Sequence, residues 1–222
     1  VILDLSDFDA PAGTPLSTAL GMDDILLEID NKSMTNRPDL WGHYGIAREL
    51  AALYHLPLKP FKYFDRNVEN TSGFHVTVLD EEHCPRMTGT QIEGLYVKPA
   101  PYWMQSHIWK VGMRPINALV DVTNYVMLAT GQPSHAYDSD HIAGHIIVRR
   151  AEENETLKLL NGKELPLNTD DLVIADDEGA VGLAGVMGGA KDSILSDTNK
   201  VILEIADFES YGIRRTALRY DN

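Results

Sequence analysis

Three uncharged polar residues, Asn124, Gln132 and His135, lie close together in an otherwise apolar part of this sequence. They belong to a stretch that runs from Arg114 to Asp138. Because buried polar groups need hydrogen-bond partners, a group of them that faces a cavity could bind a polar ligand. The alternative is a histidine satisfied inside the core beside a helix-capping network, and the residue types alone favour that interpretation.

A single carboxylate interrupts the apolar run from Val201 to Ala206. Such a run predicts a strand that is covered on both faces. Glu204, near the middle of the run, would be costly to bury unless it has a polar partner or lines a wet cavity. A glutamate that faces a sheet edge or forms a salt bridge is an equally good interpretation.

Small residues between Gly185 and Ala190 could bring the backbone close to a ligand. The segment includes Gly188 and Gly189. It lacks the Lys-Ser/Thr pair of a phosphate-binding loop and the strand–glycine loop–helix order of a dinucleotide site. A β-bulge or a tight turn is therefore an equally good interpretation.

Candidate metal ligands follow the polar stretch, at Asp138, Asp140, His141 and His145. Gly144 would break any helix that aligned the two histidines, so the sequence predicts no metal site. The single cysteine, Cys84, stands in no nucleophile motif and is expected to be a structural thiol.

Hydrophobic periodicity predicts the elements that must position these side chains. Helices are expected over residues 14–20, 40–55, 101–111, 116–131 and 208–220. Strands are expected over residues 25–30, 74–78, 86–93, 146–150, 172–175, 180–184 and 201–206. This order predicts an α+β fold, in which mixed and antiparallel sheets form a sandwich-like core flanked by helices, with a small helical N-terminal subdomain.

Two local signals refine this prediction. The helix that begins near residue 116 should be mostly buried and should end at Gly131, which tolerates positive φ, with Pro133 preventing any continuation. His135 should then lie on a short extended piece. Asn161-Gly162 between two short apolar runs predicts a hairpin with a type I′ turn.

The formal net charge of −14, from 33 acidic and 19 basic residues, would repel a phosphate backbone at long range. Arg214, Arg215 and Arg219 are a local exception, and a solvated helix face is favoured over a phosphate site for them. One cysteine allows no disulfide framework, which predicts a reducing, cytoplasmic compartment. No apolar run approaches the ~18 residues of a membrane span, so no membrane partner is predicted.

The order and spacing of several motifs resemble the beta subunit of bacterial phenylalanyl-tRNA synthetases. The motifs span nearly the whole chain and are specific in combination. They are Thr35–Leu40, Gly45–Ala52, Arg114–Tyr125, Gly131–Asp138, Gly185–Gly189, Leu203–Glu204 and Ile213–Thr216.

The resemblance implies two parts, with a boundary in the Pro-, Asn- and Asp-containing stretch 57–72. Residues 1–62 resemble a piece of the helical B1 domain with a remnant of the join to the tRNA-binding domain. Residues 70–222 resemble the B3/B4 editing domain. The chain is expected to be a piece of a longer polypeptide, in which a segment after Asn222 closes the editing pocket.

The resemblance further implies an editing site that hydrolyses tyrosine wrongly joined to the phenylalanine tRNA. Carried over by motif, His135 and Asn124 would be catalytic, and the substrate would be bound by Glu204, Gly188, Asn124 and Arg114. A Glu204 carboxylate that accepts a hydrogen bond from a phenol would favour binding of tyrosine over phenylalanine, which lacks the hydroxyl. No residue is assigned as the general base.

The implied partners are the synthetase alpha subunit, tRNA(Phe), and a tyrosine or phenylalanine ester. The resemblance implies no cofactor or metal in this part. ATP and Mg²⁺ belong to the complete ligase, and this part alone is not expected to aminoacylate. A non-catalytic scaffold module of the beta subunit is the alternative, and the two hypotheses differ in whether Glu204, His135 and Asn124 line one cavity.

Overall fold

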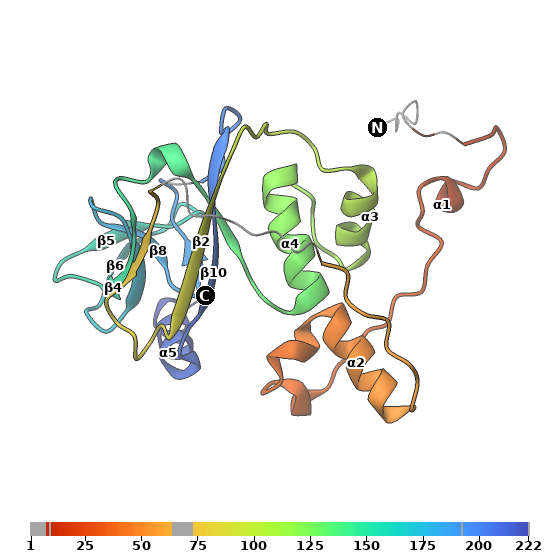
Figure 1. Cartoon of the computed structure of the whole chain (residues 1–222), viewed down its shortest axis with the longest axis horizontal. Helices are drawn as coiled ribbons and strands as arrows, with labels where there is room; N and C mark the ends of the chain where they lie inside the picture. Colours follow the sequence, from red (N-terminus) through yellow and green to blue (C-terminus); the bar gives the residue numbers. More distant parts are fainter. Residues whose placement is uncertain (1–7, 9, 64–72, 192, 222) are drawn as a thin grey trace. The chain divides into compact units, whose positions relative to one another are not determined.

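The computed structural model describes residue 8 and residues 10–63, 73–191 and 193–221, and it has the predicted α+β fold (Figure 1). The chain divides into two compact units. The first comprises Val1–Leu58 and Lys98–Gln132, and the second comprises Lys59–Val97 and Pro133–Asn222. Each unit is therefore built from two stretches of sequence. The division expected between residues 62 and 70 stays a prediction about the domains of the family.

The first unit is helical. Its helices are α1 (Leu16–Ala19), α2 (His43–Leu53), α3 (Tyr102–Lys110) and α4 (Ala118–Thr130), and the 3-10 turns η1 (Lys32–Met34) and η2 (Pro38–Trp41) precede α2. Helices α3 and α4 lie side by side (Figure 1). All four helices predicted for this unit are confirmed. Each is slightly shorter than predicted, because the residues at its ends serve as caps and turns.

Local sequence sets both ends of α4. The side chain of Asn117 is the N-cap, and its Oδ1 accepts two backbone N–H hydrogen bonds from the first turn at 3.1 Å each. Gly131 closes the other end with a φ of 80°, as predicted. The helix is less buried than expected, since its buried residues are the polar Asp121 and Thr123.

The strand predicted over residues 25–30 is not formed. The segment lies outside regular secondary structure, and its apolar side chains are exposed, Ile25 by 84% and Leu27 by 70%. Among the described residues of the first unit there is no strand that could pair with it. The prediction was wrong because a strand needs a hydrogen-bonding neighbour as well as a suitable sequence.

The second unit contains the sheets. Its strands are β1 (Val76–Val78), β2 (Arg86–Glu93), β3 (His135–Asp138), β4 (Ile146–Arg150), β5 (Thr156–Lys158), β6 (Glu164–Pro166), β7 (Leu172–Ala175), β8 (Ala180–Leu183), β9 (Met187–Gly188) and β10 (Lys200–Asp207). A 3-10 turn, η3 (Ser139–His141), and the helix α5 (Ser210–Tyr220) complete it. The strands predicted from residue 74 onward and the terminal helix are confirmed.

Two sheets of the second unit share one core. The larger has the strand order β1-β4-β7-β8-β9 and the smaller the order β2-β10-β3. Among the described pairs β1 and β4 run parallel, whereas the others run antiparallel. One buried cluster joins Val148 and Ile174 of the larger sheet to Tyr137 and Ile202 of the smaller. The predicted sandwich-like core of mixed and antiparallel sheets is thereby confirmed.

Strands β5 and β6 form the hairpin predicted around Asn161-Gly162, but the turn is not type I′. A type I′ turn requires positive φ at both central residues. Of the two residues Gly162 has one, at 84°, and Asn161 does not. Residues 159–163 separate the strands, so the connection is longer than the two residues of a type I′ hairpin. The N–H of Gly162 closes this longer turn on the C=O of Leu159 at 2.8 Å.

The buried carboxylate of Asp171 holds helix α5 on the second unit. It accepts hydrogen bonds from Thr216 Oγ1 at 3.0 Å and from the phenol of Tyr220 at 2.5 Å, and it pairs with the guanidinium of Arg219. Arg219 is thus ion-paired with a buried carboxylate, although the residue itself is exposed. The other two arginines of this helix, Arg214 and Arg215, are exposed as well, as expected for a solvated helix face.

Candidate functional site

Strand pairing brings three side chains onto one face of the smaller sheet. Strand β10 is its central strand, and Glu204 lies directly opposite His135 of β3. Residues opposite each other in an antiparallel pair share a face, and so do residues two apart along a strand. Tyr137 therefore lies on the same face, diagonal to Glu204. The interpretation of Glu204 as a residue at a sheet edge is wrong.

Glu204 has a polar partner inside the core. It is 8% exposed, and its Oε2 accepts a hydrogen bond from the phenol of Tyr137. Among the described residues no cation forms a salt bridge with it. Burial raises the pKa of Glu204 to about 7, and the hydrogen bond from Tyr137 opposes that rise. A carboxyl in this state is partly protonated near neutral pH.

Apolar side chains cover the sheet beside Glu204, on the side of strand β2. Gly89 of β2 lies opposite Glu204 and presents no side chain. A Cβ at Gly89 would lie 2.8 Å from the ring of Phe74 and 2.9 Å from Val76, so these two apolar side chains pack directly on its backbone. The glycine thus lets an apolar layer close over the sheet, which explains why the neighbouring carboxylate is so poorly hydrated.

His135 lies between Tyr137 and the small-residue segment. Its ring is half-buried and meets the ring of Tyr137 edge-on, with centroids 4.6 Å apart. Burial lowers the pKa of His135, so the imidazole is neutral at neutral pH. On its other side the ring touches Gly188 of β9, where a Cβ would come within 2.7 Å of Cε1 and 2.8 Å of Nε2. The structure therefore groups His135, Glu204 and Gly188.

Asn124 and Arg114 belong to the first unit, where Asn124 is half-buried on α4 and Arg114 is exposed before it. Their membership of the site stays a prediction. Tyr137 is the residue that the sequence analysis missed. A signal for it was present, since it stands two residues after His135 on a predicted extended piece, and Glu204 was expected to need a polar partner.

Cys84 and the histidine and acidic residues that follow His135 were the other candidates in the sequence. Cys84 is fully buried, and burial raises the pKa of its thiol to about 11, which is consistent with the structural thiol predicted from sequence. Within the described part of the chain no cluster of histidine, cysteine and acidic residues could hold a metal ion. No described helix is long and apolar enough to cross a bilayer.

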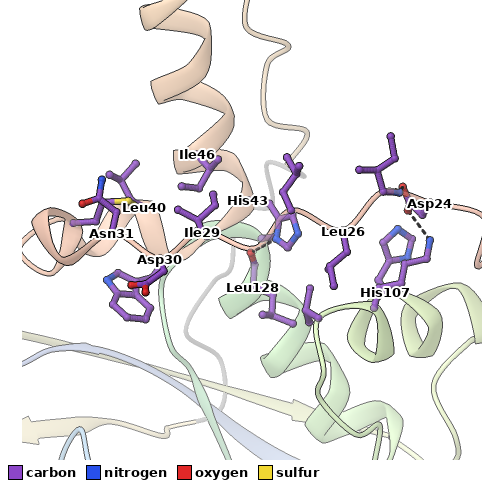
Figure 2. Close-up of a pocket in the computed structure, with 18 of the residues that line it drawn as sticks. Asp24, Leu26, Ile29, Asp30, Asn31, Leu40, His43, Ile46, His107 and Leu128 are labelled. Carbon is purple, nitrogen blue, oxygen red and sulfur yellow. Dashed lines mark hydrogen bonds and ion pairs between the residues drawn. The ribbon is translucent and has the colours of Figure 1, made fainter.

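The first unit has its own cavity, of about 880 Å³ (Figure 2). Much of its lining is apolar, with Leu26 and Leu128 among the side chains that face it. Two of its polar groups are paired with neighbours: His43 Nδ1 lies 2.8 Å from the C=O of Leu128, and Lys110 Nζ lies 2.8 Å from the carboxylate of Asp24. None of the residues that line it is a predicted site residue. We therefore place the candidate chemistry at Glu204.

The raised pKa of Glu204 predicts a dependence of stability on pH. The folded state holds the proton up to about pH 7 and the unfolded state only to 4.5, so the free energy of unfolding should fall as pH rises through this window. This difference in the pKa of Glu204 between the folded and unfolded states corresponds to about 3 kcal/mol of stability, at 1.36 kcal/mol for each pKa unit. Urea unfolding of the wild type and of Glu204→Gln between pH 4 and 8 measures it. If the free energy of unfolding changed with pH in the same way in both proteins, the raised pKa of Glu204 would be contradicted.

Comparison with known proteins places the chain in a family. The B3/4 domain family matches residues 83–222. The phenylalanine–tRNA ligase beta subunit of Solibacter usitatus is 42% identical over 95% of this chain and 27% of its own length. That of Psychrobacter arcticus is 43% identical over 96% of this chain and 27% of its own length. The chain thus spans about a quarter of the length of these relatives.

A solved structure, an N-terminal fragment of the phenylalanyl-tRNA synthetase beta-subunit from Pyrococcus horikoshii, is 19% identical and aligns over 89% of this chain and 63% of that one, with a TM-score of 0.46. The family match takes in more than half of the chain. The relatives bear the same name as the family inferred from the motifs, and the resemblance is confirmed. The chain belongs to the B3/4 domain family.

Proposed function

We propose that this chain is the editing part of a phenylalanine–tRNA ligase beta subunit and that it hydrolyses tyrosine wrongly esterified to tRNA(Phe). One observation carries the proposal: a carboxylate buried in a central strand, without a cation partner among the described residues, accepts a hydrogen bond from a phenol. The relatives are named phenylalanine–tRNA ligase beta subunits, and tyrosine, which differs from phenylalanine by one hydroxyl, is the amino acid that such a ligase would have most difficulty excluding.

The substrate class follows from that carboxylate. Tyrosine and phenylalanine differ by one hydroxyl group, so a pocket built to accept phenylalanine cannot exclude tyrosine completely. A second site with a buried hydrogen-bond acceptor binds tyrosine more tightly than phenylalanine, because phenylalanine would leave the acceptor without a partner. Glu204 supplies the acceptor.

The hydrolytic step needs a positioned water and stabilisation of the developing oxyanion, and no protein nucleophile. Burial keeps His135 neutral, so its imidazole can accept a hydrogen bond from water or orient the ester. The proposal assigns Asn124 to the same task and Arg114 to the end of the tRNA. Gly188, which has no side chain, lets the His135 ring pack directly against its backbone.

The complete ligase would supply what this chain lacks. The net charge of −14 repels the phosphates of tRNA at long range, so other parts of the complete ligase must provide most of the binding energy for tRNA. The proposed partners are the alpha subunit and tRNA(Phe). ATP and Mg²⁺ serve aminoacylation in the complete ligase, and no part of that step is assigned to this chain.

A deacylation assay tests the proposal. The complete ligase that carries this chain should release tyrosine from Tyr-tRNA(Phe) at least about tenfold faster than phenylalanine from Phe-tRNA(Phe). Gly188→Ala should slow tyrosine release by about a hundredfold, since a displaced catalytic group costs roughly that factor, and the new methyl would overlap the ring of His135.

Gly182→Ala is the matched control. Gly182 pairs with Gly188 in the same sheet, but a Cβ there would meet its nearest atoms at 3.8 Å, an ordinary contact. This variant should keep wild-type rates. A wild-type ligase that releases neither amino acid would overturn the proposal and favour the non-catalytic scaffold. Equal effects of the two alanine variants would show that the site is elsewhere.

A further inference from the structure

Tyr137 places a second phenol at the carboxylate that the proposed function reserves for the substrate. Its hydroxyl donates to Glu204 Oε2 across the diagonal of the β3–β10 pair. The two residues are 67 positions apart in the sequence. A built-in phenol could either compete with the substrate's phenol for Glu204 or hold the carboxylate in position for it.

Packing decides against competition. Tyr137 is 2% exposed, and its ring belongs to the buried cluster between the two sheets. The ring of His135 covers one side of it. If a ligand displaced the hydroxyl from Glu204, the phenol would exchange a hydrogen bond to a carboxylate for no contact with solvent, since it is too buried to be hydrated, and a hydrogen bond to a charged group is among the stronger ones.

The carboxylate has capacity for a second donor. An ionised carboxylate offers two oxygens with about four acceptor positions. Among the described residues Tyr137 is the hydrogen-bond donor to Glu204, and that bond is made to Oε2. Oε1 therefore remains for an incoming hydroxyl.

We infer that Tyr137 is a positioning residue that fixes Glu204 through Oε2 and directs Oε1 to the hydroxyl of a tyrosyl ester, thereby setting the preference for tyrosine. This inference rests on the proposed function and adds a specificity-determining residue to it. Tyr137 acts through Glu204 and takes no part in the hydrolytic step.

The groups that face Glu204 predict how the preference depends on pH. On strand β3, the groups that face Glu204 are the phenol of Tyr137 and the imidazole of His135, which is neutral at pH 7 because burial lowers its pKa. On strand β2 the residue opposite Glu204 is Gly89, which has no side chain. The thiol of Cys84, close enough to sense the charge of Glu204, is protonated. The Tyr137 hydrogen bond is the interaction that lowers the pKa of Glu204, so its loss should raise that pKa further.

Tyr137→Phe tests the inference, because it removes one hydroxyl and keeps the ring. In single-turnover deacylation at pH 7, the complete ligase carrying this variant should lose roughly tenfold of its preference for tyrosine. Its rate on Phe-tRNA(Phe) should be unchanged. The preference should partly recover as the pH is raised above 7, because Glu204 then ionises again. A purely structural role would lower stability without moving this pH profile.

Tyr220→Phe is the matched control, since Tyr220 also donates its phenol to a carboxylate of the second unit, that of Asp171, at 2.5 Å. It should lose stability but keep the wild-type preference and pH profile. An unchanged preference in Tyr137→Phe would overturn the inference, and so would an increased one, which would identify Tyr137 as a competitor. A wild-type ligase without tyrosine release would instead overturn the proposed function itself.

A second measurement needs no variant. Tyrosine labelled with ¹³C at the phenol carbon reports the hydrogen bond of Tyr137 in the wild-type chain, and p-cresol serves as the probe for the substrate's ring. Binding of p-cresol should leave the Tyr137 resonance at its hydrogen-bonded position. Movement of that resonance to the position of an unbonded phenol would overturn the inference.

Discussion

Replacing Glu204 by alanine in the complete ligase is expected to slow the release of tyrosine from Tyr-tRNA(Phe) by roughly ten- to a hundredfold. A hydrogen bond from a phenol to a carboxylate contributes about 1.5–3 kcal/mol, and 1.4 kcal/mol corresponds to a factor of ten. Release of phenylalanine should be unchanged or faster, because its ring gains nothing from the carboxylate. Single-turnover deacylation of both charged tRNAs measures the two rates.

The same experiment separates selectivity from catalysis. If Glu204 were the general base, both esters would slow by the same factor, and that result would refute its assignment as the acceptor for the hydroxyl. Glu155→Ala is a suitable control. Glu155 is another largely buried carboxylate of the second unit, but it is paired with Arg149 at 2.8 Å. Its loss should reduce stability and leave the ratio of the two rates intact.

The largest expected effect on stability is that of Asp171→Ala, at about 3 kcal/mol. Asp171 is fully buried and gathers the hydroxyls of Thr216 and Tyr220, the guanidinium of Arg219 and the N–H of Asn168. Removing it leaves these donors without their acceptor, and leaves the charge of Arg219 partly buried. Urea unfolding should show the loss, and hydrogen exchange should show that the amides of α5 become unprotected.

Asp170→Ala controls for the loss of a negative charge at the same place. Asp170 is the neighbouring residue and its side chain is exposed. An exposed carboxylate contributes within about 0.5 kcal/mol, so this variant should unfold like the wild type. Similar losses for the two variants would mean that Asp171 acts through overall charge and not through its buried hydrogen bonds.

Much of the fold was predictable from local sequence. Strands β2 and β4 begin and end at the predicted residues, and α4 ends at Gly131 as expected. These features depend on the periodicity of apolar side chains and on capping residues, which act within a few positions of the chain. The motifs also singled out His135, Gly188 and Glu204, which the structure brings together.

The failures share one cause. Residues 25–30 have the composition of a strand but no described partner, so they remain outside any sheet. The turn at Asn161-Gly162 is set by the pairing of Lys158 with Glu164, which leaves more than two residues in the connection. In both cases the outcome depends on what the segment pairs with, which its own residues do not specify.

The sequence by itself determined the family, most of the secondary structure of the second unit and the identity of a carboxylate that would need a partner. Tertiary structure decided which partner it has. Only the antiparallel register between β3 and β10 puts the phenol of Tyr137 next to Glu204, and only Gly89 allows the apolar cover that raises the pKa of that carboxyl. Periodicity determines which side chains share a face of one strand. Register between distant strands determines which side chains meet, because shifting a strand by one residue would turn Glu204 to the other face of the sheet.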